Sequence, residues 1–271
     1  MKRATVLSIL WLALLSTPAL SFAPSSRVLS QSVSSARGAT LAMAPDDVQQ
    51  QEGEGLTIYG HPGTRSPMVN WACYELGLNK VAAGDLSKNP HPFGQIPCFA
   101  DGNAKDPTIV FESGAILIYL VQNYATNTDL TDAQKASIIS WVTWANASLD
   151  PICFLETPDG KVYDTGLREV NNKRIAQLEA LLQKQDGVLV PSAGFSIADV
   201  AVASYLLYVA QFFPKVVDHL KSTWPNIANY MKEAASRPAY AQAFGPDLQE
   251  YLVEKLSEVP DASAKKIFGM F

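Results

Sequence analysis

The chain has 271 residues, enough for one large domain or two modest ones, of which 48% are hydrophobic and 17% are charged. That balance is too apolar for a disordered chain, and a formal net charge of −5 argues against a nucleic-acid-binding surface. The three cysteines, Cys73, Cys98 and Cys153, have a number and spacing that predict neither a disulfide framework nor a metal site, so we expect them in the core.

The beginning of the chain has the composition of targeting segments. Lys2 and Arg3 precede an apolar run from Val6 to Leu15, which predicts a signal peptide because the run is too short to span a bilayer comfortably. Residues 22–45 are rich in serine, carry arginines and lack acidic residues, a composition typical of transit peptides. We therefore leave residues 1–45 out of the predicted fold, and we expect no membrane insertion of the remaining chain.

The junction between these two segments, residues 19–24, reads Ala-Leu-Ser-Phe-Ala-Pro. It resembles the junction of bipartite plastid presequences in algae whose plastid lies inside an endomembrane. The resemblance implies a plastid protein, and plain secretion is the alternative. Fusing residues 1–45 to a fluorescent protein tests this, because label in the secretory pathway would contradict the plastid hypothesis.

The next predicted unit, residues 54–127, alternates strands and helices. Apolar strands, helical spacing and turn residues follow one another in the order β-α-β-(short α)-β-β-α, a compact α/β unit. The predicted elements are a strand over 56–60, a helix from Met68 to a stop at Gly77, a weak strand over 80–83, strands over 98–100 and 108–111, and a buried helix over 115–124.

From residue 129 to 250 the strand signals disappear and helical spacing dominates. Apolar residues repeat on one face over 132–149 and again over 167–184. Ser196 and Asp199 predict a capping box at the start of the most hydrophobic helix. Shorter helices are expected over 216–220 and 226–236, and residues 251–271 are expected to form a tail. The pattern predicts a second, all-helical domain.

Three segments of the first unit resemble the glutathione transferase superfamily, and two segments of the helical unit resemble the helical domain of that family. They are residues 59–67, 92–97, 111–116, 141–146 and 196–200, in that order. The resemblance extends loosely from about Leu56 to Phe244. It implies a thioredoxin-like domain that binds glutathione as a co-substrate, followed by a helical bundle.

Ile96 and Pro97 stand at the head of a predicted strand. Proline cannot donate to a strand ladder, so it belongs at an edge or in a special turn. The resemblance implies a cis bond here, with Ile96 offering its backbone to the cysteine of glutathione by strand addition. Gln95 would add an amide donor. An ordinary edge proline is the alternative.

Glu112 and Ser113 precede the buried helix. The resemblance assigns them to the γ-glutamyl end of glutathione, with the helix N-terminus and the Ser113 hydroxyl receiving its carboxylate and Glu112 facing its ammonium group. Ser113 would also serve simply as an N-cap, and both roles are compatible.

The catalytic group is expected at the start of the first helix, where a hydroxyl and the helix N-terminus can stabilise the glutathione thiolate. Ser66, followed by Pro67, resembles the hydroxyl of serine-type members, but it also makes a purely structural helix start. Counting back from Gly77, the family spacing points instead to Gly63 or Thr64. Whether Ser66, Thr64 or neither supplies the catalytic hydroxyl therefore remains open.

Lys88 and His91 are candidates for the glycyl carboxylate of glutathione, because basic residues often occur in this region of the family. A solvated loop is the alternative for both. The stretch they occupy, residues 85–93, is shorter than is usual in the family.

The resemblance implies an enzyme that directs the glutathione thiol at an electrophilic, apolar small molecule or a peroxide, without a metal. The second substrate would lie between the domains near Trp141, Trp144 and Phe154, of which we expect two to be core residues. A carrier of apolar ligands or an assembly module that has lost the chemistry is the alternative. The absence of a cysteine at the first helix start argues against a thiol-exchange protein. A homodimer is also implied.

Overall fold

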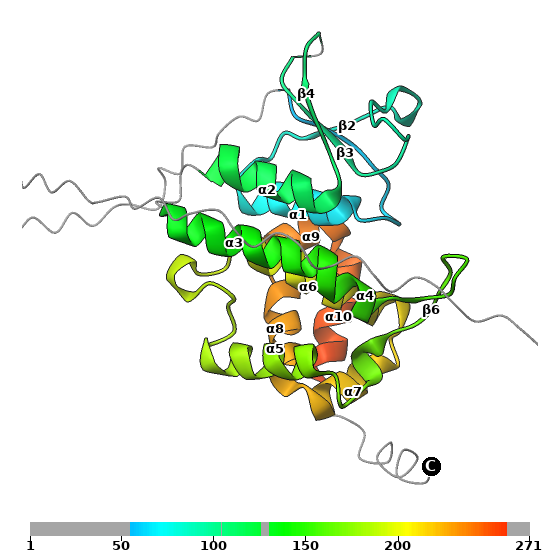
Figure 1. The fold of residues 1–271 in the computed structure, drawn as a ribbon, viewed down its shortest axis with the longest axis vertical. Coiled ribbons are helices and arrows are strands. Elements are labelled where there is room, and N and C mark those ends of the chain that lie inside the picture. The colour runs from blue at the N-terminus through cyan, green and yellow to red at the C-terminus, as the bar shows by residue number, and fades with distance from the viewer. Residues whose placement is uncertain (1–54, 104, 126–129, 259–271) are drawn as a thin grey trace, which may run out of the picture. The chain divides into compact units, whose positions relative to one another are not determined.

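The computed structural model describes residues 55–103, 105–125 and 130–258, so the predicted targeting segment lies outside the described residues. Within these ranges, a four-stranded sheet with two helices comes first and a set of helices follows (Figure 1). This is the order of elements that the sequence predicted, an α/β portion followed by a helical portion.

The sheet brings two loops together at one end. Its strands are paired in the order β2-β1-β3-β4, with β1 and β2 parallel and the other pairs antiparallel. Because β1 and β3 are antiparallel and Tyr59 lies opposite Cys98, the loop after β1 and the loop before β3 meet at the same end of the sheet. The strands are β1 (Thr57–Tyr59), β2 (Ala82–Ala83), β3 (Cys98–Asp101) and β4 (Thr108–Phe111).

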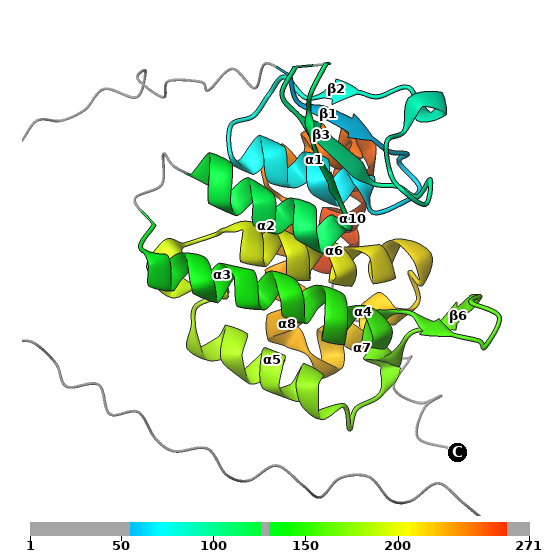
Figure 2. The same ribbon diagram turned by 45° about the horizontal axis from the view of Figure 1, so that its top comes forward.

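Helices α1 (Ser66–Glu75) and α2 (Ser113–Tyr124) lie between the sheet and the other helices (Figures 1 and 2). Helix α1 buries the apolar face that its spacing predicted, and α2, predicted to be buried nearly all round, is buried along one face, with Ala115, Gln122 and Asn123 exposed. Cys73 on α1 and Cys98 on β3 are fully buried, and so is Cys153 in the helical portion, which confirms the predicted core positions.

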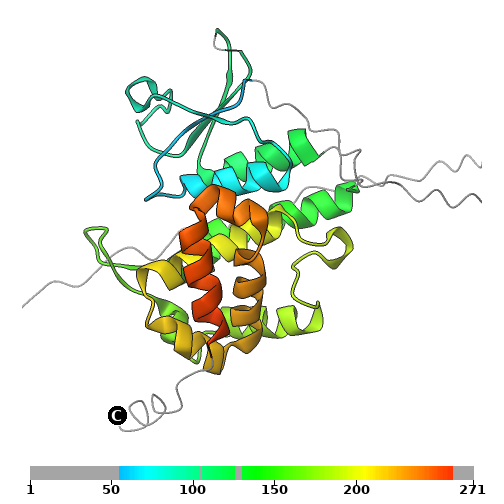
Figure 3. The ribbon, with the colours of Figure 1, turned by 180° about the vertical axis from the view of Figure 1, so that it is seen from behind.

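The helical portion is arranged around α6 (Ile197–Phe212), in which every residue from Ile197 to Ala210 is buried. The capping box expected at Ser196 and Asp199 is present at its start. Seen from behind, α9 lies against α1 and α10 against α8 (Figure 3). The other elements are α3 (Asp132–Trp144), a π-helical turn η3 (Ala145–Leu149), α4 (Asp150–Cys153), α5 (Lys173–Lys184), α7 (Val216–Thr223), α8 (Pro225–Ala235), α9 (Pro238–Phe244) and α10 (Pro246–Ser257).

Three expectations for this portion were wrong. A hairpin of β5 (Leu155–Glu156) and β6 (Val162–Asp164) follows α4, although no strand was expected after residue 127. Helix α5 begins only at Lys173, because the Asn172 side chain caps it by accepting hydrogen bonds from the amides of residues 174 and 175. The chain also continues as α10 to Ser257, where a tail had been expected from residue 251, because α10 buries two leucines one turn apart.

Polar contacts fix the far end of α1 against the helical portion. Arg237 donates to both carboxylate oxygens of Glu75, at 2.6 and 2.7 Å, and Trp71 donates to the same carboxylate at 2.9 Å. The guanidinium carbon of Arg237 lies 3.8 Å from the ring centroid of Phe195. Because this ion pair is bidentate and partly buried, it holds α1 in one orientation.

Candidate functional site

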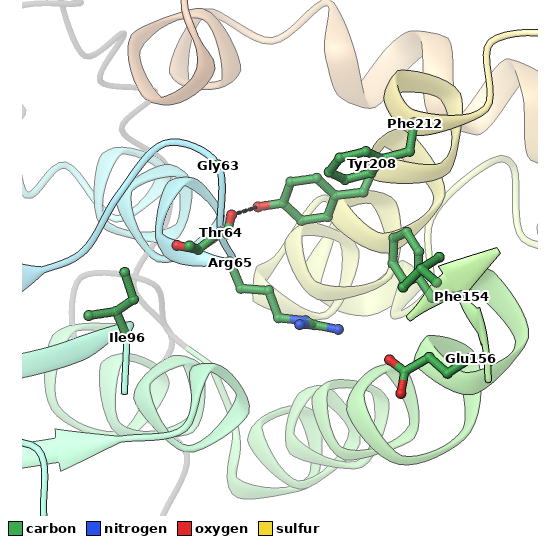
Figure 4. A pocket seen from close by; sticks show the side chains of 9 residues that line it. Gly63, Thr64, Arg65, Ile96, Phe154, Glu156, Tyr208 and Phe212 are labelled. Carbon is green, nitrogen blue, oxygen red and sulfur yellow. Dashed lines mark hydrogen bonds between the residues drawn. The ribbon is translucent and has the colours of Figure 1, made fainter. Parts of the chain in front are cut away.

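A cavity of about 360 Å³ opens where the loop after β1 and the loop before β3 meet the helical portion (Figure 4). One side of it belongs to the α/β portion and the other to the β5–β6 hairpin and the C-terminal half of α6. The lining residues are Gly63, Thr64, Arg65, Ile96, Phe154, Glu156, Val162, Tyr208 and Phe212.

Ile96 lies at the edge of this cavity, directly before β3. The bond between Ile96 and Pro97 is cis, as the family resemblance implied, and β3 begins at the next residue. Within the described ranges, no hydrogen bond uses the backbone N–H or C=O of Ile96. Both groups are therefore available to an extended peptide ligand. The neighbouring Gln95 is exposed, and its carbonyl accepts a hydrogen bond from the Asn89 side chain at 2.9 Å.

The two candidate hydroxyls lie in different environments. Thr64 lines the cavity, whereas Ser66 is buried and its Oγ packs against the backbone of Gly60. The two hydroxyl oxygens are 2.8 Å apart, and the Ser66 Oγ also accepts from the amide of His61 at 3.1 Å. Ser66 is the first helical residue rather than the N-cap, which is Arg65. Thr64 thus lines the cavity with its hydroxyl donating to the His61 carbonyl at 2.7 Å, whereas Ser66 is enclosed behind it.

Helix α6 holds the Thr64 loop in place. The Tyr208 hydroxyl donates to the Thr64 carbonyl at 3.1 Å, a contact drawn in Figure 4. Burial raises the pKa of Tyr208 well above its ordinary value, so this phenol remains a donor at physiological pH. The position of the candidate hydroxyl therefore depends on a residue 144 positions later in the chain.

The start of α2 is linked to the helical portion through Asn146. Ser113 is buried and donates to the Asn146 side chain at 3.2 Å, and the same oxygen accepts from the Tyr205 hydroxyl at 2.8 Å. Burial raises the pKa of Tyr205 to about 12. A Cβ on Gly114 would lie 2.8 Å from the Asn146 amide, so glycine is needed for this close approach.

Ser113 is the first residue of α2 and not its N-cap, so the purely structural N-cap role expected for it was wrong. The cap position belongs to Glu112, which is exposed and has a φ of 68°. A positive φ is unfavourable for glutamate and often marks a functional position. The free amides at the start of α2 lie next to the Ser113 hydroxyl, an arrangement that suits a carboxylate.

The two basic candidates differ in their accessibility. Lys88 is exposed at the end of a short 3₁₀ helix, η1 (Leu86–Lys88), with its ammonium 3.6 Å from the Asp85 carboxylate. His91 is buried, its Nδ1 accepts from the amide of Phe93 at 3.0 Å, and its ring packs 4.7 Å from that of Phe111. Lys88 is therefore accessible to solvent, whereas His91 is held within its loop, and neither residue lines the cavity.

Sequence reasoning missed most of the helical side of the cavity. Of the three aromatics expected near it, Phe154 lines the cavity, while Trp141 and Trp144 pack against the core, as expected for two of the three. The Tyr208 and Phe212 side chains were not identified, because aromatic residues near the end of a buried helix resemble ordinary core residues. A possible signal was their spacing of four, which places both on one helical face.

The cysteines take no part in the cavity. Burial raises the pKa of the Cys73 thiol to about 12 and that of Cys153 well above its ordinary value, so both remain protonated. Among the described residues, no group of three or more His, Cys, Asp or Glu side chains is placed to hold a metal ion. The same residues include no helix that is long and apolar enough to cross a membrane.

The arrangement of the sheet, the cis proline and the helices is the glutathione transferase fold. Ure2p5 from Phanerochaete chrysosporium, cocrystallised with 1-(S-glutathionyl)-2,4-dinitrobenzene, matches 76% of this chain and all of its own chain, with a TM-score of 0.57 and 20% identity. A glutathione transferase from Burkholderia graminis with two bound glutathione molecules per subunit matches 71% of this chain and 88% of its own, with a TM-score of 0.52 and 22% identity.

Similar curated sequences carry related names. A glutathione S-transferase domain-containing protein of Dictyostelium discoideum is 28% identical over 193 residues, which cover 64% of this chain and 73% of the relative. A second such protein of the same organism is 32% identical over 164 residues, which cover 56% of this chain and 61% of the relative. A glutathione S-transferase of Hyoscyamus muticus is 26% identical over 187 residues, which cover 63% of this chain and 85% of the relative. No protein-family model matches the chain. The names and the fold together support the glutathione transferase superfamily.

Proposed function

We propose that the protein is a glutathione transferase that directs the thiol of glutathione at an electrophilic small molecule. The observation that carries this proposal is the meeting of two groups at one cavity, the unbonded backbone of Ile96 and the hydroxyl of Thr64. Glutathione bound along Ile96 would bring its sulfur near the start of α1. There, a hydroxyl and the helix N-terminus would favour the thiolate.

The proposal extends to the two ends of glutathione through the family resemblance, because the residues it assigns to them do not line this cavity. The γ-glutamyl carboxylate would bind the free amides at the start of α2 and the Ser113 hydroxyl, which would turn from Asn146 to donate to it. The ammonium group would face Glu112. Gln95 would add an amide donor, and Lys88 would receive the glycyl carboxylate. Because His91 is buried and its Nδ1 already accepts a hydrogen bond, we do not assign it to the ligand.

The first test is retention of the full chain on immobilised glutathione together with conjugation of glutathione to a generic aryl halide. Retention with conjugation supports the transferase. Retention without conjugation supports instead the alternative of a non-catalytic carrier or assembly module. Failure of retention would contradict both, and would leave only the fold.

Replacing Ser113 with alanine should weaken glutathione binding about tenfold, because one hydrogen bond to a charged group is lost. We expect the KM for glutathione to rise while kcat at saturating glutathione changes little, since the lost contact is far from the sulfur. Ser140→Ala is the matched control, because Ser140 is exposed on α3 and donates within its own helix. An unchanged KM in Ser113→Ala would contradict the assignment.

We also propose that two copies pair through the α/β portion and the first helix of the helical portion, α3, as the family resemblance implies. Phe93 is 78% exposed and Phe111 is 38% exposed, and the His91 ring contacts both. An exposed aromatic cluster of this kind favours a protein contact. Light scattering should return about twice the chain mass of 29.4 kDa, and Phe93→Asp should return the single mass. A single mass for the parent protein would contradict the dimer.

For localisation, we propose a plastid protein directed by residues 1–45, with secretion as the alternative. The fluorescent fusion of these residues decides between the two.

A further inference from the structure

The charged side chains around the cavity do not balance. Arg65 on one wall is paired with Asp150, whose two carboxylate oxygens lie 2.6 and 2.7 Å from one guanidinium nitrogen. Glu156 on the opposite wall is exposed, and no ion pair or side-chain hydrogen bond among the described residues involves it. In Figure 4 the Glu156 carboxylate and the Arg65 side chain both extend toward the open space. The lining holds one cation, Arg65, and one anion, Glu156, and because Arg65 is paired with Asp150 behind the lining, the three groups together leave one negative charge at Glu156.

The β5–β6 hairpin explains why this carboxylate faces the cavity. Glu156 is the cross-strand partner of Val162, and both line the cavity, as expected for partners on one face of a two-stranded ribbon. The basic residues of the hairpin region are already paired. Lys161 lies 2.8 Å from Asp159, and Arg168 lies 2.9 Å from the carboxylate of Asp164. No cation of the hairpin is left to neutralise Glu156.

The rest of the wall is aromatic. The rings of Phe154 and Phe212 are 6.0 Å apart in an edge-to-face arrangement, and Phe212 is 61% exposed. Tyr208 continues this surface toward Thr64. Aromatic faces attract planar ligands, and their negative faces also favour cations. The aromatic lining and the negative charge thus both favour a planar ligand that carries a positive charge.

We propose that this cavity takes an aromatic ligand carrying a positive charge, and that Glu156 is the residue that selects this charge. The description of the ligand as the second substrate rests on the proposed function. The aromatic part would lie against Phe154 and Phe212, with the cationic group near the Glu156 carboxylate. An anionic aromatic of the same size would be disfavoured.

Equilibrium binding of two dyes to the full chain tests this without glutathione and without catalysis. The probes are a cationic benzothiazolium dye and an anionic anilinonaphthalene sulfonate, titrated at low ionic strength and followed by fluorescence. A unit negative charge about 5 Å from a charged dye in a water-like medium raises the affinity for the cationic dye about fourfold and lowers the affinity for the anionic dye about fourfold. Glu156→Gln should therefore reduce the ratio of cationic to anionic affinity on the order of tenfold, and Glu156→Lys on the order of a hundredfold.

Two further variants make the result specific. Glu250→Gln removes an exposed carboxylate on α10, which does not line the cavity, and should leave the ratio unchanged. Phe212→Ala should weaken both dyes together, because it removes part of the aromatic wall. The proposal is overturned if Glu156→Gln and Glu156→Lys leave the ratio as it is, or if Phe212→Ala affects neither dye. A shifted ratio without glutathione conjugation would retain this inference and reject only the transferase.

Discussion

Replacing Thr64 with alanine should lower kcat for glutathione conjugation about a hundredfold, the usual effect of removing one donor to a developing or stabilised anion. Retention on immobilised glutathione should remain, because the Ile96 and Ser113 contacts are not altered. The pH dependence of kcat/KM for the electrophile, measured at saturating glutathione, should also move upward, since the bound thiol would titrate closer to its ordinary pKa of about 8.5. Thr64→Ser keeps the hydroxyl and should retain most of the activity.

The hydrogen bonds around Thr64 explain this expectation. Its Oγ1 accepts from the amide of Ser66 at 3.3 Å and can accept from the Ser66 hydroxyl at 2.8 Å. Its own proton goes to the carbonyl of His61 at 2.7 Å, and under the proposed function it would turn to the glutathione sulfur. Accepting two hydrogen bonds makes the Thr64 hydroxyl a better donor.

Ser66→Ala is the informative comparison. Because Ser66 is a positioning residue in this scheme, its loss should reduce kcat less than tenfold and cost about 1 kcal/mol of stability. A hundredfold loss in Ser66→Ala with an active Thr64→Ala protein would transfer the role to Ser66. Full activity in both variants would mean that neither hydroxyl stabilises the thiolate.

Replacing Asp199 with alanine should lower the free energy of unfolding by about 4 kcal/mol. The carboxylate is fully buried and accepts from the amides of Leu189 and Ser196, at 3.0 and 2.9 Å, and from the Tyr230 hydroxyl. Its removal leaves buried donors unsatisfied at the start of the central helix α6. Urea unfolding followed by tryptophan fluorescence measures the change. Asp247→Ala, which removes an exposed acid from the first turn of α10, should cost less than about 0.5 kcal/mol.

The same residue predicts a pH dependence. Burial raises the pKa of Asp199 from 3.8 to about 6, so the folded protein binds this proton more tightly than the unfolded chain. The resulting stability is fully present below pH 3.8 and is lost as the pH rises through about 6. Between pH 5 and 7.5, the unfolding free energy of the parent protein should fall by about 1.5 kcal/mol relative to Asp199→Asn, which cannot titrate. A constant difference between the two proteins would contradict the raised pKa.

Local features of the sequence were sufficient for much of the first portion. The strand at Thr57–Tyr59, the helix around Cys73 and the buried helix up to Tyr124 were predicted because periodicity and turn residues act over a few positions. The capping box at Ser196 was predicted for the same reason, since its partners are three residues apart. The hairpin after α4 was missed because its strands are two and three residues long.

The role proposed for the Ile96 backbone in ligand binding was predicted from the sequence only because the motif around Pro97 resembles that of the glutathione transferase family. The choice between Thr64 and Ser66 could not be made in that way, because both are hydroxyls two residues apart at one helix start. Their difference is one of burial. Ser66 is covered by Gly60, and Thr64 is held at the cavity by Tyr208.

The order of the elements up to Tyr124 and the capping of α6 could therefore be predicted from the chain alone, because each depends on neighbours a few residues apart, whereas the cis bond at Pro97 was predicted through the family resemblance. Three other features became visible only in the folded protein: that Thr64 lines the cavity while Ser66 is buried, that Asn146 connects α2 to the helical portion, and that Glu156 faces Arg65 across the cavity. These features join residues tens of positions apart, and their burial and charge balance arise only when α6 packs against α1 and the hairpin lines the other side of the cavity.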